Sequence, residues 1–152
     1  MNVFSNKTLS MTVLMTPDKA NFTGNVHGGE IMKMLDQVAY ACASKYSGSY
    51  VVTLSVDKVL FKTPIRVGEF VTFLANVNYV GRTSMEIGVK VIAEDLRQSS
   101  VRHTNTCYVT MVAIDDYGKP TSVPPLDLEN EDDRRRFDEG KARKKKRLAD
   151  ST

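Results

Sequence analysis

The sequence is poor in cysteine and histidine, and it has no long hydrophobic run. Two cysteines, Cys42 and Cys107, and two histidines occur among 152 residues. So few nitrogen and sulfur ligands predict no metal site, and two isolated thiols favour buried side chains over a disulfide. No segment approaches the roughly 18 consecutive apolar residues of a membrane helix, and the start M-N-V-F-S-N-K lacks the apolar core of a signal peptide. We therefore expect a cytoplasmic protein that does not contact membranes.

The bulk composition is that of one globular domain followed by a charged tail. Hydrophobic residues make up 41% of the chain and charged residues 26%, which is ordinary for a domain of this length. Charge is unevenly spread, because nine basic residues fall in 134–147 after an acidic stretch at 127–133. Such a block could bind nucleic acid or form a solvated helix whose acidic start and basic end suit the helix dipole. The body has no aromatic and basic face, so we favour the solvated helix and expect no nucleic acid partner. The predicted units are residues 1–125 and a helical tail, 126–152.

One stretch, Asn21–Asp36, carries the clearest chemical signal. It reads N-F-T-G-N-V-H-G-G-E-I-M-K-M-L-D, and small polar residues and glycines make its first half a loop. Gly28 and Gly29 come directly before an amphipathic run, so the loop enters a helix there. The first N–H groups of a helix have no internal partners and carry partial positive charge. This element is suited to hold an oxygen that gains negative charge.

The predicted helix spans about 28–45 and ends near Ser47-Gly48. Its apolar residues recur at helical spacing and form one broad stripe: Ile31, Met34, Leu35, Val38, Ala41 and Cys42. Asp36 falls at the margin of this stripe, roughly 140° from Ile31. A carboxylate there is either a partly desolvated base or an ordinary solvated side chain, and the pattern alone leaves both open.

The remaining pattern is that of strands joined by short turns. Period-2 alternation and β-branched residues predict strands at 8–15, 50–62, 70–80, 84–94 and 101–114. In the second of these we expect Val52, Leu54, Val56 and Leu60 to share one face. Strands joined so tightly are antiparallel, and a twisted five-stranded sheet can bury one face on a single helix. The prediction is an α+β fold whose free sheet edge pairs with a second copy.

These residues resemble the acyl-coenzyme A thioesterases of the hotdog superfamily. The resemblance rests on Gly24-Asn25-Val26-His27-Gly28-Gly29, on the later Leu35-Asp36, on Gly81-Arg82-Thr83-Ser84, and on Gly118-Lys119-Pro120. It implies hotdog dimers, in which one long central helix is wrapped by a five-stranded antiparallel sheet, and assembly into hexamers as a trimer of dimers. It also implies hydrolysis of fatty acyl-CoA without a cofactor.

The resemblance assigns roles to individual residues. Asp36 matches the catalytic aspartate, as general base or nucleophile, and Asn25 of the partner subunit matches the asparagine that orients the water or the thioester. His27 is expected beside the oxyanion site, where Gly28 and Gly29 offer N–H groups. Arg82, Thr83 and Ser84 form either a phosphate-binding turn or a plain hairpin, and the resemblance favours contact with coenzyme A.

Two other functions stay open at this point. A hotdog dehydratase would use a histidine base, for which His27 is available, although the pair of Asn25 and Asp36 suits hydrolysis better. A non-catalytic nucleotide-binding module would rely on the basic tail. The preferred acyl-chain length is not fixed by the sequence, although Met32, Tyr40 and Phe61 lie where they could limit a tunnel.

Overall fold

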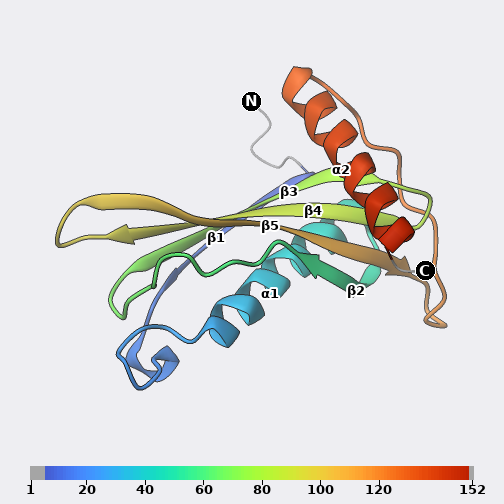
Figure 1. Ribbon diagram of the computed structural model, residues 1–152. Coiled ribbons are helices and arrows are strands. Elements are labelled where there is room, and N and C mark those ends of the chain that lie inside the picture. Colours follow the sequence, from blue (N-terminus) through green and yellow to red (C-terminus); the bar gives the residue numbers. More distant parts are fainter. Residues whose placement is uncertain (1–5, 151–152) are drawn as a thin grey trace.

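The computed structural model describes residues 6–150 and consists of five strands and two long helices (Figure 1). The elements in chain order are β1 Thr8–Leu14, a 3-10 turn at Pro17–Lys19, α1 Gly28–Ser47, β2 Tyr50–Asp57, β3 Phe70–Val80, β4 Ser84–Asp95, β5 Ser100–Ile114 and α2 Glu131–Asp150. No helix in this range is long and apolar enough to cross a membrane.

The strands form one antiparallel sheet in the order β1-β3-β4-β5-β2, with α1 against one face and α2 against the other (Figure 1). The inward side chains of β3, β4 and β5 are mostly Val, Ile, Ala and Met, and they are buried against the α1 stripe. Leu35, Ala39 and Cys42 are each fully buried there. The expected hotdog arrangement, one long helix on a five-stranded antiparallel sheet, is confirmed.

The helix α1 ends where the sequence indicated. Gly48 follows its last residue with φ 68° and donates its N–H to the Ser44 carbonyl at 2.9 Å. A left-handed conformation at this position favours glycine and satisfies a carbonyl of the last turn. The next residues can therefore reverse direction at once and enter β2.

The strand β2 differs from the prediction in length and in orientation. It ends at Asp57 rather than at residue 62, because Lys58 adopts φ 68° and leaves the extended conformation. Val51 is buried, whereas Val52 and Leu54 are 47% and 62% exposed. The prediction that Val52, Leu54 and Val56 share one face was therefore wrong. A register shift between Thr53 and Ser55 restores the parity, so that Val56 packs on the core.

The helix α2 is not a free solvated helix, although the sequence favoured that interpretation. Arg143 donates two hydrogen bonds, of 2.7 and 2.8 Å, to the buried carboxylate of Glu86 on β4. Phe137 packs on Tyr79 of β3 with ring centroids 4.8 Å apart, and Gly140 is buried over the same tyrosine. The outer face of β3 and β4 carries polar groups that need partners, and α2 supplies them.

Both cysteines are fully buried and unpaired, as the sequence predicted. Burial disfavours the thiolate and raises the pKa of Cys42 and of Cys107 to about 12. Only about one thiol in ten thousand is ionised at pH 8 under these conditions, and the thiolate is the reactive form.

We therefore predict that the folded protein reacts very slowly with a chromogenic disulfide reagent at pH 8. Fewer than one thiol per chain should react within minutes, and two should react at once in denaturant. The released chromophore measures both numbers. Rapid reaction of either thiol in the folded state would contradict the burial of that residue.

Candidate active site

The loop before α1 is fixed by its own side chains. The Asn21 side-chain oxygen accepts hydrogen bonds from the Thr23 N–H at 2.9 Å, the Thr23 hydroxyl at 2.6 Å and the Asn25 N–H at 3.2 Å. Between them Gly24 adopts φ 84°, a conformation that favours glycine. Val26 donates to the Ile65 carbonyl at 2.7 Å and so ties this loop to the segment before β3. The loop therefore presents Asn25 and His27 in a defined arrangement.

The first two residues of α1 offer unused N–H groups. Among residues 6–150, neither Gly28 nor Gly29 donates a backbone hydrogen bond outside the helix. Both lie in the first turn of α1, where no helical carbonyl precedes them to accept an internal hydrogen bond. A Cβ on Gly29 would meet nothing within 4 Å, so its surroundings are open. His27, the residue before the helix, is exposed and makes no side-chain cap. The helix start can receive an oxygen that develops negative charge.

A cavity of about 160 Å³ adjoins this helix start. Gly28 and Phe61 meet at its mouth, where a Cβ on Gly28 would come 3.2 Å from the phenyl ring. Most of its lining is apolar. Besides Gly28 and Phe61, the lining residues are Val26, Ile31, Leu60, Thr63, Pro64, Ile65, Val91, Thr104 and Asn105. If a carbonyl oxygen is held at the helix start, a small apolar group on the carbonyl carbon could enter this cavity.

Asp36 lies on the half-buried margin of α1, as predicted, and it has a partner that the sequence did not indicate. The Thr53 hydroxyl on β2 donates a 2.7 Å hydrogen bond to the Asp36 carboxylate. Nothing in the local pattern linked these two residues, which belong to different elements. This hydrogen bond orients the carboxylate.

The structure does not bring all predicted site residues together within one protomer. Asp36 lies two turns after Gly28, which places it about 12 Å further along α1. The Asn25 amide donates to the Thr23 hydroxyl at 3.3 Å, not to Asp36. A group held at Gly28 is thus beyond the reach of the Asp36 carboxylate of the same chain.

The third predicted element, Arg82-Thr83-Ser84, is the hairpin turn between β3 and β4. Arg82 is exposed, and its carbonyl accepts the Val123 N–H at 2.9 Å. Lys144 of α2 donates to the Ser84 hydroxyl at 3.2 Å, which sequence analysis missed. A second cation therefore stands at this turn beside Arg82.

The turn is distant from the helix start of the same protomer. The cavity beside Gly28 touches Val91 of β4, whereas Ser84 is the first residue of that strand. At about 3.4 Å per residue the two positions are about 24 Å apart. Among the described residues no cluster of three His, Cys, Asp or Glu could hold a metal ion.

The segment that carries Phe61 is held by a buried ion pair. Glu69 is 4% exposed and accepts hydrogen bonds from the Arg102 guanidinium at 2.5 and 2.9 Å. Its carboxylate also accepts the Arg66 N–H at 2.7 Å, while Arg102 bonds the Pro64 carbonyl at 2.7 Å. Hydrogen bonding to Arg102, against the opposing effect of burial, lowers the pKa of Glu69.

The five-stranded sheet on one long helix is the fold of the hotdog thioesterases, and the free N–H groups at the start of α1 suit thioester chemistry. The chain belongs to the thioesterase superfamily, whose family model matches residues 23–100, and it is a thioester hydrolase. It is 48% identical over 139 residues to the protein VdlD of Helicobacter pylori, covering 91% of this chain and 79% of that protein.

Two solved structures extend the similarity to the whole described fold. A hexameric acyl-CoA thioesterase, solved in its apo form, has a TM-score of 0.90 at 34% identity, covering 95% of this chain and 93% of that one. An acyl-CoA hydrolase of Staphylococcus aureus, solved with butyryl coenzyme A and coenzyme A, has a TM-score of 0.88 at 31% identity, covering 97% and 90%. Single alanine variants of that hydrolase replace an asparagine, an aspartate and a threonine. The aspartate comes 15 positions after the asparagine, and the threonine comes 17 positions after the aspartate.

The Glu69–Arg102 pair generates a prediction about stability and pH. Because the folded-state pKa of Glu69 is lowered, the pair stabilises the fold above the unfolded pKa of glutamate and loses this contribution as pH falls through the folded value. Glu69→Gln should lower the free energy of unfolding at pH 7 by about 1–3 kcal/mol.

The difference between wild type and Glu69→Gln should shrink below about pH 4. Urea unfolding at pH 7 and pH 3.5 measures it, with Glu94→Gln, an exposed site on β4, as the matched control. An equal difference at both pH values would show that the charge of Glu69 does not provide the stabilisation.

Proposed function

We propose that this protein hydrolyses acyl-CoA thioesters to a free fatty acid and coenzyme A. The observation that carries the proposal is Asp36 held by Thr53 on a helix whose first N–H groups are unused. Hydrolysis needs a base or nucleophile and donors for the oxyanion, and this helix provides both kinds of group. The acyl-CoA hydrolases among the similar structures support the same substrate class.

The chemistry follows from these groups. As a base, Asp36 takes a proton from water, and the hydroxide adds to the thioester carbonyl carbon. The oxyanion is held by the N–H groups of Gly28 and Gly29 until the C–S bond breaks, and the departing sulfur takes up a proton. As a nucleophile, the Asp36 carboxylate instead forms a mixed anhydride that water then cleaves. Both routes use the same residues.

The second catalytic residue is an asparagine of the loop before α1. Asn25, the predicted residue, is half-buried and lies close to the helix start. A specific observation favours Asn21 as an alternative. Asn21, Asp36 and Thr53 have the same spacing along this chain as the asparagine, aspartate and threonine replaced in the Staphylococcus aureus hydrolase. Asn21 also fixes the loop through its side-chain oxygen.

We propose that two subunits complete each site. The gap of about 12 Å between Gly28 and Asp36 is too long for one chain to act alone, whereas a partner can bring its asparagine and helix start to Asp36. Within residues 6–150 the outer edge of β2 is unpaired and carries exposed apolar side chains, Tyr50, Val52 and Leu54. Pairing of this edge across a twofold axis would cover them. The hexameric relative supports further assembly, for which we propose a trimer of dimers.

The phosphates of coenzyme A fit the turn at 81–84. Arg82, Thr83, Ser84 and Lys144 provide two cations and two hydroxyls there. Because this turn is about 24 Å from the helix start of its own protomer, it would serve the helix start of the partner subunit. A cytoplasmic location and the absence of a cofactor and of nucleic acid stay predictions. The dehydratase alternative gains no support, since the similar solved structures are an acyl-CoA thioesterase and an acyl-CoA hydrolase.

We predict that Asp36→Ala lowers turnover by about 10²-fold or more, because it removes the base or nucleophile. Asn25→Ala and Asn21→Ala identify the asparagine, of which one should cause a comparable loss. Free-thiol release from a panel of acyl-CoA esters measures turnover, and Asp116→Ala, an exposed residue in a distant turn, is the control. Full activity of Asp36→Ala would rule out the assignment.

Mixing two inactive variants tests the shared site. If Asp36 and the asparagine come from different subunits, a mixed dimer of Asp36→Ala and Asn25→Ala chains contains one intact site. Free reassortment should then restore about one quarter of wild-type activity. No recovery after verified subunit exchange would mean that each site is built from one chain. The same mixture with Asn21→Ala serves if that residue proves to be the catalytic one.

A further inference from the structure

A second and larger cavity lies mainly on the outer face of the sheet, beneath α2, and its lining also includes Lys45 near the end of α1. It is a cleft of about 850 Å³ between the outer face of the sheet and α2. Strand register defines its floor as two cross-strand rows of side chains, Ser10-Leu74-Lys90-Thr106 and Thr8-Asn76-Gly88-Tyr108. In the described part of the chain, the cleft shares no lining residue with the cavity beside Gly28. It is therefore separate from the proposed thioester site.

The floor is hollow because of one glycine. A Cβ on Gly88 would come 2.5 Å from the Asn78 amide nitrogen, so only glycine leaves room for that amide. Asn78 is 5% exposed; it accepts from the Asn76 amide at 2.8 Å and donates to Glu86 at 3.1 Å. A fixed row of amides thus lies at the bottom of the cleft.

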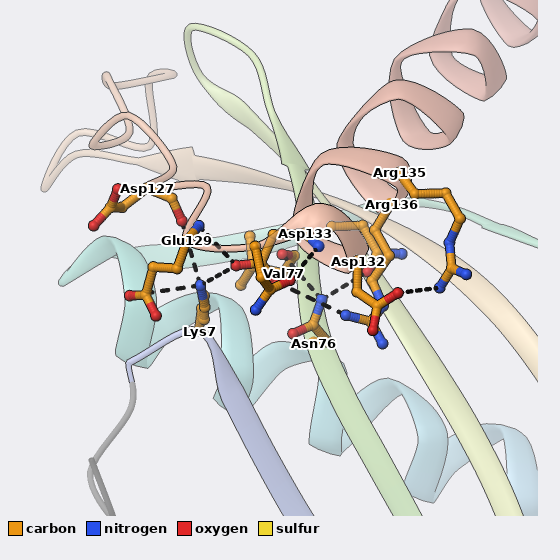
Figure 2. A network of polar contacts seen from close by, with 11 residues as sticks. Lys7, Asn76, Val77, Asp127, Glu129, Asp132, Asp133, Arg135 and Arg136 are labelled. Atoms are coloured by element: carbon orange, nitrogen blue, oxygen red, sulfur yellow. Dashed lines mark hydrogen bonds and ion pairs between the residues drawn. The ribbon is translucent and has the colours of Figure 1, made fainter. Parts of the chain in front are cut away.

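One face of α2 forms the wall, and it is rich in arginine. Arg143 is committed to Glu86 and stacks over the Tyr108 ring at 3.6 Å from its centroid. Arg135 and Arg136 differ from it, because their ion pairs are to aspartates of their own helix at 3.6 and 3.8 Å (Figure 2). These contacts leave most guanidinium N–H groups of the two residues available.

The aspartate beside Arg136 is occupied by another cation. Lys7 approaches the Asp133 carboxylate at 2.7 Å, and the Glu129 N–H donates to the same oxygen at 3.1 Å (Figure 2). Asp133 is buried, and these hydrogen bonds, against the effect of burial, lower its pKa. Arg136 therefore shares the Asp133 carboxylate with Lys7, and the closer contact is that of Lys7.

The charges of the lining are strongly unequal. Lys45, Lys90, Arg135, Arg136 and Arg143 face the cleft, and Glu139 is the one acidic residue among its described lining. Guanidinium groups match phosphate oxygens in geometry and charge, and lysine adds a point charge. Amides and hydroxyls on the floor provide the donors and acceptors that recognise ribose and a base edge. The volume suits a ligand of nucleotide size.

We propose that this cleft binds a nucleoside polyphosphate, with the phosphates at Arg135, Arg136 and Lys90 and the nucleoside over the amide floor. The site goes beyond the proposed hydrolysis and does not depend on it. Coenzyme A also carries a phosphorylated nucleoside, so a free nucleotide and the nucleotide end of coenzyme A are two sources of the same chemistry. The experiment separates them.

Isothermal titration of the intact protein with ATP, inorganic tripolyphosphate and coenzyme A is the test. We expect ATP to bind, and the double variant Arg135→Gln/Arg136→Gln to weaken it at least tenfold. Lys90→Gln on β4 should weaken it as well, independently of the helix. The control Lys145→Gln/Lys146→Gln removes the same charge from exposed positions on α2 that do not line the cleft, and it should bind ATP as wild type does.

Each outcome decides between the alternatives. Absence of ATP binding, equal binding by the Arg135/Arg136 variant, or binding of tripolyphosphate as tight as that of ATP would overturn the proposal. Coenzyme A competing with ATP in wild type, and losing affinity in the double variant, would support the cleft with substrate as the source. If the double variant changes the oligomeric state by light scattering and ATP does not bind, the cleft is a subunit contact and the proposal fails. If coenzyme A does not compete with ATP, basal thioester hydrolysis by all these variants should be unchanged.

Discussion

Burial of the α1 stripe against the inner face of the sheet is the constraint on which the other features depend. Leu35, Ala39 and Cys42 must face the sheet, and this requirement fixes the rotation of the helix about its axis. Asp36 then lies at the margin of the buried arc, where Thr53 of β2 reaches it. A backbone hydrogen bond fixes where α1 begins. The Val26 N–H donates to the Ile65 carbonyl, five residues before the stripe starts at Ile31. The packing of α1 thus positions both the Asp36 carboxylate and the N–H groups at the start of the helix.

Under the proposed mechanism, the geometry of one helix leaves a single protomer incomplete. The unused backbone N–H groups lie at the start of α1, whereas the carboxylate that accepts from Thr53 is two turns later. No change of rotamer closes a gap of about 12 Å. The edge strand β2 carries Thr53 on its inner side and exposed apolar residues on its outer side. The strand that orients Asp36 is therefore also the one at which we propose that a partner subunit pairs.

The features predictable from sequence were those governed by local periodicity. The α1 stripe, its end at Gly48, four of the strands and the buried cysteines follow from spacing that is visible in a short window. The end of β2 was not predictable, because Lys58 leaves the strand at a residue that looks suitable for it. Thr53 beside Asp36, and Lys144 beside Ser84, join distant segments and have no local signal. The exposed side of β2 was mistaken for part of one continuous face because Tyr50, Val52 and Leu54 are apolar, as the buried centre of the proposed subunit interface would also be.

The two faces of the sheet show how α2 differs from α1. The inner face is apolar and gains free energy by excluding water, so α1 could hardly lie elsewhere. The outer face of β3 and β4 presents Asn78 and Glu86, and Arg143 satisfies that carboxylate with two hydrogen bonds. Such pairs add little net stability, because desolvation offsets most of the attraction, but they specify orientation. We infer that the orientation of α2 matters more than its contribution to stability. The same docking that pairs Arg143 with Glu86 places Lys144 at the 81–84 turn and places Arg135 and Arg136 in the lining of the cleft.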